Sequence, residues 1–224
     1  MKRAMMLTGL IAATTLLYPL HIVNAQTRPP EDMVFAGISG SMVGPERDSY
    51  ENSMRIGGRI GIQRELDLPG ASFLIGEMAY TIRGTGYKTD GTVQSLVGEM
   101  DYSFTREGHS DYGYLEIPVM YGVRMGQVRV YGGPCFGIFL HGTSVDEITY
   151  EDTHIIPPPD NGEKKSIDAS SMTIPEVGLV IGADYRLGKF RVGPRYSRSL
   201  NNVYDNEDES SHFSTVTLTL GYII

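Results

Sequence analysis

The 224-residue chain carries 27 acidic against 19 basic side chains, a formal net charge of −8. This acidic balance excludes a nucleic-acid partner, because a phosphate backbone demands clustered lysines and arginines. The single cysteine, Cys135, excludes an internal disulfide, so stability must come from backbone hydrogen bonds and packing.

The N-terminus has the pattern of an export signal. Lys2-Arg3 supplies a positive start, an apolar run covers Leu7–Leu17, and Val23-Asn24-Ala25 ends in the small residue that signal peptidase needs. A transmembrane anchor is the alternative, but the apolar run is shorter than the ~20 residues of a spanning helix. We therefore expect a signal peptide over residues 1–25 and one mature domain over residues 26–224.

Apolar and polar residues alternate with a period of two from Met33 to the end of the chain. The pattern forms eight runs, at residues 33–43, 53–65, 72–88, 112–125, 127–141, 172–186, 189–199 and 212–224. Each run is long enough for the ~9–11 residues of a tilted membrane strand, whereas soluble strands usually stop at ~5–6. The runs predict an all-β fold, an eight-stranded antiparallel up-and-down transmembrane β-barrel.

Three runs show two distinct faces most clearly. The apolar faces carry Leu115, Ile117, Val119, Tyr121 and Val123 in the fourth run, Val128, Val130, Phe136, Ile138 and Leu140 in the fifth, and Val216, Leu218, Leu220 and Tyr222 in the last. The opposite faces carry polar or small residues. A soluble β-sandwich gives the same alternation, so the pattern alone leaves both architectures open.

Two glycines predict tight hairpins. Met125-Gly126 and Leu187-Gly188 are expected as two-residue loops, in which glycine adopts the positive φ that such turns demand. These loops predict the cross-strand pairs Val123 with Val128, Tyr185 with Phe190, and Asp184 with Arg191. In that register apolar side chains face apolar ones and opposite charges meet.

The connections between the runs alternate in length. Long ones are expected at residues 44–52, 89–111, 142–171 and 200–211, and short ones at 66–71 and the two glycine hairpins. Outer-membrane barrels have long loops outside the cell and short turns in the periplasm. The alternation therefore predicts a barrel in the outer membrane, surrounded by outer-membrane lipid.

Several segments resemble a known family. They are Gly76-Glu77-Met78-Ala79-Tyr80 with Arg83-Gly84, Tyr114-Leu115-Glu116-Ile117-Pro118, and Val130-Tyr131-Gly132-Gly133-Pro134-Cys135-Phe136-Gly137. These motifs are similar to those of the small outer-membrane barrels called porin-family or PorT-like proteins, and the likeness covers about residues 33–224. The resemblance implies an eight-stranded barrel in the outer membrane of a Gram-negative bacterium, usually without an assigned biochemical activity. Some relatives belong to a protein-secretion and gliding apparatus.

Charged residues on the polar faces are expected at two levels of the lumen. The mid-barrel set is Arg59, Glu77, Glu116 and Arg195, and the set near the periplasmic rim is Arg124, Arg129, Asp184 and Arg191. A charge facing lipid at mid-depth costs ~2–4 kcal/mol, so these side chains must point inward. Glu77 and Glu116 suggest a general acid–base pair. A structural salt-bridge plug in a lumen too narrow for a pore is the favoured interpretation.

The histidines of the mature chain fall in or beside the long loops, at His109, His141, His154 and His212. Two groups imitate the clusters of lipid-modifying barrel enzymes, His141 with Ser144 and Asp146, and His212 with Ser210 and Ser211. A nucleophilic site needs its base and hydroxyl within hydrogen-bond reach, which sequence does not establish. We favour polar loop residues and predict no catalytic, cofactor-binding or metal-binding residue, since no metal-ligand spacing occurs.

Lipid contact occupies the predicted wall and packing fills the predicted lumen, so the loops remain as the surface for recognition. The longest loop, 142–171, is strongly acidic; its carboxylates suit divalent cations, although a solvated loop is the favoured interpretation. We expect a monomeric, non-enzymatic barrel that binds envelope or secretion-apparatus proteins through its loops or its periplasmic rim, without a cofactor. The alternatives are an outer-leaflet lipid-modifying enzyme and a soluble periplasmic lipid-binding barrel.

Overall fold

The computed structural model describes residues 29–44, 51–94, 101–150, 161–204 and 211–224. In this part of the chain the strands are β1 (Glu31–Gly44), β2 (Glu51–Asp67), β3 (Ser72–Gln94), β4 (Asp101–Met125), β5 (Val128–Tyr150), β6 (Lys164–Ser166), β7 (Glu176–Leu187), β8 (Phe190–Ser199) and β9 (His212–Ile223). A short 3₁₀ helix, η2, spans Ala169–Ser171. The same residues contain no helix long and apolar enough to cross a membrane.

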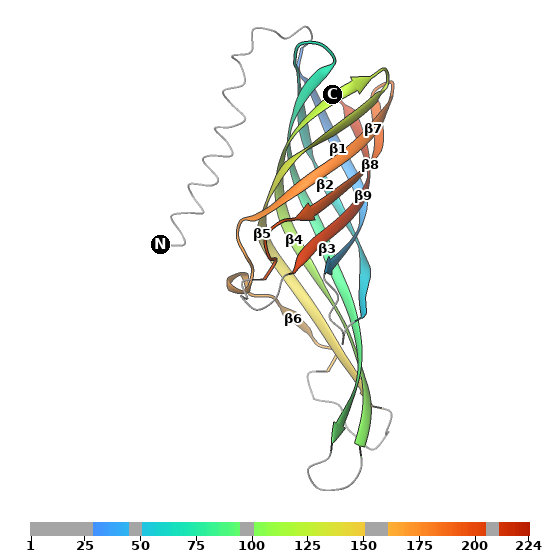
Figure 1. Cartoon of the computed structure of the whole chain (residues 1–224), viewed down its shortest axis with the longest axis vertical. Coiled ribbons are helices and arrows are strands. Elements are labelled where there is room, and N and C mark those ends of the chain that lie inside the picture. Colours follow the sequence, from blue (N-terminus) through green and yellow to red (C-terminus); the bar gives the residue numbers. More distant parts are fainter. Residues whose placement is uncertain (1–28, 45–50, 95–100, 151–160, 205–210) are drawn as a thin grey trace.

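All strands but β6 close into a barrel of eight (Figure 1). Antiparallel pairing runs from β1 to β5 in chain order, continues from β5 to β7, and then passes through β8 to β9. β1 pairs with β9 from Met33↔Ile223 to Gly44↔His212, which completes the ring. The predicted all-β, eight-stranded antiparallel barrel is confirmed.

The two glycine hairpins form, but each turn lies one residue later than predicted. Gly126 and Gly188 have φ of 66° and 62°, and each is the first residue of its turn. The residue after each glycine has no positive φ, as in a type II′ turn, in which glycine takes the first position. The observed pairs are therefore Val123↔Val130, Tyr185↔Val192 and Arg186↔Arg191, and the predicted pairs are wrong by two residues. A shift of two keeps every side chain on its predicted face.

Three strands are longer than predicted. β3 continues to Gln94, β4 begins at Asp101 and β5 continues to Tyr150, so much of the predicted loops 89–111 and 142–171 is strand. The prediction failed there because these segments are mostly polar and present no continuous apolar face to lipid.

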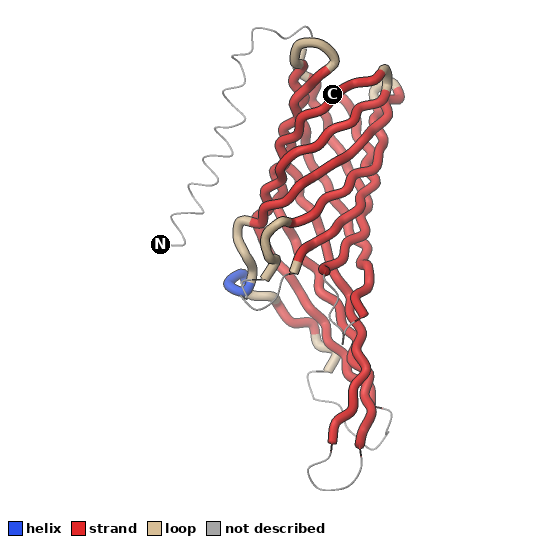
Figure 2. Tube along the Cα trace, in the orientation of Figure 1, coloured by secondary structure: helices blue, strands red, loops and turns tan. Residues whose placement is uncertain are grey.

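The extra length forms a projection that we call the outer arm. It comprises residues 87–94 of β3, 101–110 of β4 and 142–150 of β5, with β6 paired along the edge of β5. Figures 1 and 2 show it extending from the end of the barrel opposite the short turns. Long connections lie outside the cell in outer-membrane barrels, so the arm points away from the periplasm.

The outward face of the barrel is apolar and forms the lipid-facing surface. Ile56, Ile60, Ile181 and Leu220 are among its exposed side chains. Tyr121, Tyr185 and Tyr222, predicted on this face near the short turns, are 55%, 43% and 40% exposed. Tyrosine rings at this level suit the headgroup layer.

A register shift changes the facing of β5 at the base of the arm. Gly113 pairs with His141, whereas Tyr114 pairs with Phe139, so β5 has one extra residue at this point. The extra residue reverses the alternation. In the barrel part of β5 the odd-numbered residues face inward. In the arm part, beyond the shift, even-numbered residues such as Asp146 lie on that same side.

Candidate functional site

A chain of alternating charges crosses the middle of the lumen. In order, its members are Arg195, Glu77, Arg59, Glu116, Arg83 and Glu176. Glu77 accepts two hydrogen bonds from Arg195, at 2.7 and 2.8 Å, and also pairs with Arg59. All six side chains are buried, so each desolvated charge depends on its neighbours of opposite sign.

The second half of this chain of charges reaches toward the loop end. Arg83 donates two hydrogen bonds to Glu176, at 2.8 and 2.9 Å. Glu116 joins the two halves, 3.5 Å from Arg59 and 3.7 Å from Arg83. The Arg83 guanidinium also stacks on Tyr114, 4.1 Å from the ring centroid. Three arginines thus face three carboxylates, and the central network carries no net charge.

A second network lies at the short-turn end of the lumen. Arg129 donates to Asp184 at 2.8 Å and pairs with Glu65, while Arg191 lies 2.7 Å from Glu31 and 3.5 Å from Asp184. The full network comprises Arg124, Arg129, Arg186 and Arg191 with Glu31, Glu65, Asp67 and Asp184. Four arginines and four carboxylates balance here as well.

The eight charged residues singled out from sequence all belong to these two networks. Their two predicted levels correspond to the central and the short-turn network. Sequence reasoning missed six further members, Glu31, Glu65, Asp67, Arg83, Glu176 and Arg186. The alternation of faces along a strand could have identified two of them, because residues separated by an even number lie on the same face. Arg83 is on the same face of β3 as Glu77, and Glu176 is on the same face of β7 as Asp184.

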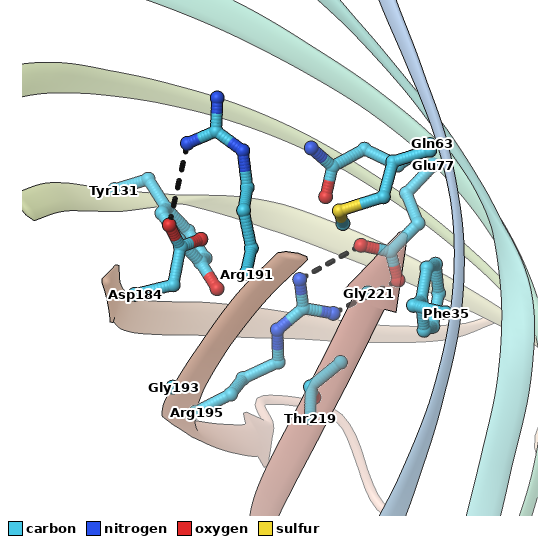
Figure 3. Close-up of a pocket in the computed structure, with 11 residues that line it drawn as sticks. Phe35, Gln63, Glu77, Tyr131, Asp184, Arg191, Gly193, Arg195, Thr219 and Gly221 are labelled. Atoms are coloured by element: carbon cyan, nitrogen blue, oxygen red, sulfur yellow. Dashed lines mark hydrogen bonds and ion pairs between the residues drawn. The ribbon is translucent and has the colours of Figure 1, made fainter. Parts of the chain in front are cut away.

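Little space separates the two networks (Figure 3). Figure 3 shows Arg191 with Asp184 on one side of a pocket and Arg195 with Glu77 on the other. The cavity has a volume of about 10 Å³, which is room for no more than one water molecule. Tyr131 lines it and lies 5.5 Å from the Arg195 guanidinium.

An apolar layer lies at the loop end of the lumen. This lid consists of Val43, Tyr112, Tyr114, Phe139, Met172, Val203 and Phe213. Met172 and Val203 come from connections outside the ladder and are joined there, since Thr173 donates its backbone N–H to the Val203 carbonyl at 2.9 Å. The Tyr112 and Tyr204 hydroxyls are hydrogen-bonded at 2.5 Å, which ties the lid to the barrel wall.

The outer arm carries a polar and aromatic cluster on the face that continues the inside of the barrel. Asp146 accepts a hydrogen bond from Arg106 Nε at 3.2 Å and another from the Tyr87 hydroxyl. The hydrogen bond from Arg106 holds the pKa of Asp146 below its ordinary value, and Tyr87 acts in the same direction. The rings of Phe104 and Tyr150 pack nearby in a tilted arrangement, with centroids 6.4 Å apart. We call these five residues the inner arm cluster.

The opposite face of the arm is simpler. Lys88 and Glu107 form an ion pair at 2.8 Å, and Thr105 donates a hydrogen bond to Asp90 at 2.7 Å. These side chains are mostly exposed. The two faces of the arm therefore differ, one half-buried and aromatic, the other solvated and charged.

Comparison with known proteins identifies the family of this barrel. The outer membrane protein beta-barrel domain family matches residues 24–205, most of the chain. The chain belongs to this family. Outer-membrane localisation follows, and the soluble periplasmic alternative is set aside.

Solved structures with a similar chain path are also outer-membrane proteins. Ail of Yersinia pestis is 14% identical, with a TM-score of 0.46, over 88% of this chain and 100% of that one. Neisserial surface protein A is 13% identical, with a TM-score of 0.41 and the same coverage. OprG of Pseudomonas aeruginosa is 11% identical, with a TM-score of 0.31, over 90% and 99%. A comparison with curated proteins finds no match.

The histidine clusters considered from sequence are not assembled in the described part of this outer-membrane barrel. His141 lies on the outward face, where its Nε2 contacts the Tyr80 hydroxyl at 2.8 Å, and Asp146 lies on the other face. His212 Nδ1 contacts the Asn201 carbonyl at 3.2 Å. His154 and Ser210 lie outside the described residues. No group of three potential metal ligands occurs within the described ranges.

Proposed function

We propose that this outer-membrane barrel is a non-enzymatic protein with a plugged lumen, whose outer arm docks a partner protein of the envelope. The inner arm cluster is the observation that carries the proposal. Ordering a residue costs ~1–2 kcal/mol of backbone entropy, and the barrel ladder closes without the arm. An ordered, two-faced extension beyond the membrane therefore points to a role in recognition.

The plug is supported by three layers in series. Two neutral ion networks and an apolar lid fill the cross-section, and the cavity between the networks has room for one water molecule. Eight-stranded barrels leave an interior just wide enough for side chains. The lumen then serves stability, and the surfaces at the two ends remain for partners.

A non-enzymatic role is supported by how the candidate nucleophile groups lie. The histidine base His141 and the acid Asp146 are on opposite faces of β5, so they cannot act on one substrate atom. In the lumen, the carboxylates Glu77 and Glu116 are bound by arginines and enclosed. Among the described side chains, the histidine groups considered above do not place a base beside a nucleophile as a lipid-modifying activity requires.

Export by a cleaved signal peptide belongs to the same proposal. The mature protein would begin at Gln26, five residues before Glu31, the first residue of β1. Mass spectrometry of the protein isolated from outer membranes tests this, with a terminus elsewhere as the contrary result.

Shortening the arm tests where docking occurs. Lys88 and Glu107 are directly opposite, so an Asn-Gly turn replacing residues 89–106 rejoins β3 to β4 in register. A strain with this variant should contain the barrel in normal amounts but reproduce the envelope-protein composition of a full deletion. If the shortened protein is abundant and the envelope-protein composition is that of the wild type, the arm is not the docking surface. The periplasmic rim is then the next candidate.

Point variants give a matched comparison on the two faces. Asp146→Asn and Tyr87→Phe remove hydrogen bonds of the inner arm cluster, whereas Thr105→Val removes one from the opposite face. We expect the first two to weaken docking and the third to leave it unchanged. The same loss in all three variants would mean that general arm stability, and not the inner face, is being measured.

A further inference from the structure

The barrel wall carries one charge that has no acidic partner among the described residues. Asp32 and Arg64, near the short turns, form an ion pair at 2.7 Å, and Arg55 pairs with Asp111 at 3.4 Å near the loop end. Arg198 of β8 is exposed on the outward face and has no such pair in the described part of the chain. Because a lone guanidinium on a lipid-facing wall is unfavourable at mid-depth, its position and surroundings need an explanation.

Arg198 lies near the outer boundary of the membrane. Phe190, at the short-turn end of the same strand, packs edge-to-face against Tyr222 with ring centroids 5.3 Å apart, and such aromatic pairs mark the periplasmic interface. Tilted strands rise about 20 Å along the barrel axis over the eight residues between Phe190 and Arg198. The apolar band of such barrels is ~25 Å tall, so the Cα of Arg198 lies about 5 Å inside its outer edge. A long arginine side chain spans that distance and brings the guanidinium to the outer headgroup level.

Hydroxyl groups surround Arg198 on the same face. Ser214 of β9 lies directly opposite Arg198 in the ladder, and its Oγ accepts a hydrogen bond from the Tyr196 hydroxyl at 3.3 Å. The Ser214 proton is then available to a ligand beside the guanidinium. A planar guanidinium with an adjacent hydroxyl donor suits a tetrahedral oxyanion, which it binds in bidentate fashion.

Apolar side chains flank this group of donors. Leu179 of β7 lies opposite Arg198 on the other side of the strand and is 50% exposed, and Val216 of β9 is 56% exposed. Fatty acyl chains pack on such side chains, whereas a free anion gains nothing from them. The surroundings therefore suit an amphiphile with a phosphate on its headgroup.

We propose that Arg198, Ser214 and Tyr196 form a binding site for the phosphate of an outer-leaflet glycolipid, whose acyl chains lie on Leu179 and Val216. The outer leaflet is the source because the site is near the loop end of β8, far from the periplasmic aromatic pair. The site is independent of the outer arm and of any partner that docks there.

Native mass spectrometry of the detergent-purified, full-length mature barrel measures the bound lipid. Arg198→Gln should lower the retained phosphorylated glycolipid about ten-fold, because it removes charge-assisted hydrogen bonds. Arg198→Lys, which keeps the charge without the bidentate fork, should give an intermediate loss. Arg64→Gln, a paired arginine on the same kind of surface in the periplasmic half, is the matched control and should retain wild-type levels. Equal retention in all variants would overturn the proposal.

Added lipids distinguish the sources of phosphate without relying on any variant. Delipidated wild-type protein should bind a phosphorylated glycolipid about ten-fold more tightly than the same lipid after phosphatase treatment. Equal affinity for the dephosphorylated lipid would remove the role of the phosphate. Equal affinity for inorganic phosphate alone would show that Leu179 and Val216 contribute nothing to binding. Equal affinity for phosphatidylglycerol would show that the site does not select an outer-leaflet glycolipid. Any of these results would overturn the proposal even where Arg198→Gln fails to fold.

Discussion

Glu77 illustrates how a single buried carboxylate organises the lumen. Its side chain has no exposed surface and is shared by Arg59 from β2 and Arg195 from β8. An ion pair of this kind contributes little relative to a well-packed apolar core, because both charges lose their hydration. Removing one partner is a different matter, since the remaining charges stay buried without compensation.

Replacing Glu77 with glutamine should therefore lower the free energy of unfolding by ~3–5 kcal/mol, measured by urea unfolding in lipid or detergent. Glu116→Gln should lower the free energy of unfolding by less. Arg59 would still form its ion pair with Glu77, and Arg83 would still form its ion pair with Glu176. The control is Asp32→Asn, which breaks an exposed pair that contributes ~0–1 kcal/mol. Equal losses for Glu77→Gln and Asp32→Asn would contradict a buried network.

Asp146 of the inner arm cluster offers a prediction in pH. Its folded-state pKa is lowered by hydrogen bonds from Arg106 and Tyr87. Its contribution to arm stability is therefore fully present above the ordinary value of ~3.9 and is lost as the pH falls through the lower, folded value. A carboxyl titration by NMR should give a pKa below ~3.9, and Arg106→Gln should raise it toward that value. An unchanged titration in Arg106→Gln would separate Asp146 from this guanidinium.

At the scale of elements, the short turns fix the register of the barrel. Gly126 and Gly188 have positive φ, a region that costs an L-residue ~1–2 kcal/mol. Gly126→Ala and Gly188→Ala should each reduce stability by about that amount, seen as a lower unfolding midpoint. Gly44→Ala is the control, because no positive φ is required and a Cβ there meets no atom within 4 Å. If the unfolding midpoint of the two turn variants equals that of the wild type, alanine introduces no strain at these positions and positive φ is not required there.

The elements predicted from sequence are right wherever lipid dictates the pattern. The eight barrel strands and their outward faces follow from apolar alternation, because every second residue of a transmembrane strand faces lipid and is therefore apolar. The hairpin register was missed since positive φ at Gly126 suits either loop position until the turn type is known. The arm was missed because its strand segments, such as residues 87–94 and 142–150, are mostly polar, a composition shared by loops.

The candidate site was recoverable only in part for related reasons. Parity assigns Arg59, Glu77 and Arg195 to the lumen, but it does not say which charges meet across the barrel. That depends on side chains from strands distant in sequence, as when Arg195 reaches Glu77. The extra residue near His141 also reverses the facing of β5 and separates the predicted His141 and Asp146 cluster. The segment beyond the bulge has no alternating apolar face, so this change of phase was not visible in the sequence.

For the molecule as a whole, the plug that we propose consists of three layers of the lumen acting in series. Ions would need to pass the apolar lid, the central network and the short-turn network, each of which fills the cross-section with side chains. Opening one layer leaves the other two in place. This arrangement predicts that no single substitution converts the barrel into a steady pore.

Planar-bilayer recordings test that prediction. The wild-type barrel should give no large, steady conductance, and Glu77→Gln or Val203→Ala should remain closed despite lower stability. Val203 contributes to the lid and Glu77 to the central network, so each variant perturbs a different layer. A double variant should still be sealed by the short-turn network around Arg129 and Asp184. Steady currents of porin size in the wild type would refute the plug. Such currents in the Val203→Ala variant alone would instead make the lid the only seal, and the ion networks would then line a hydrated passage.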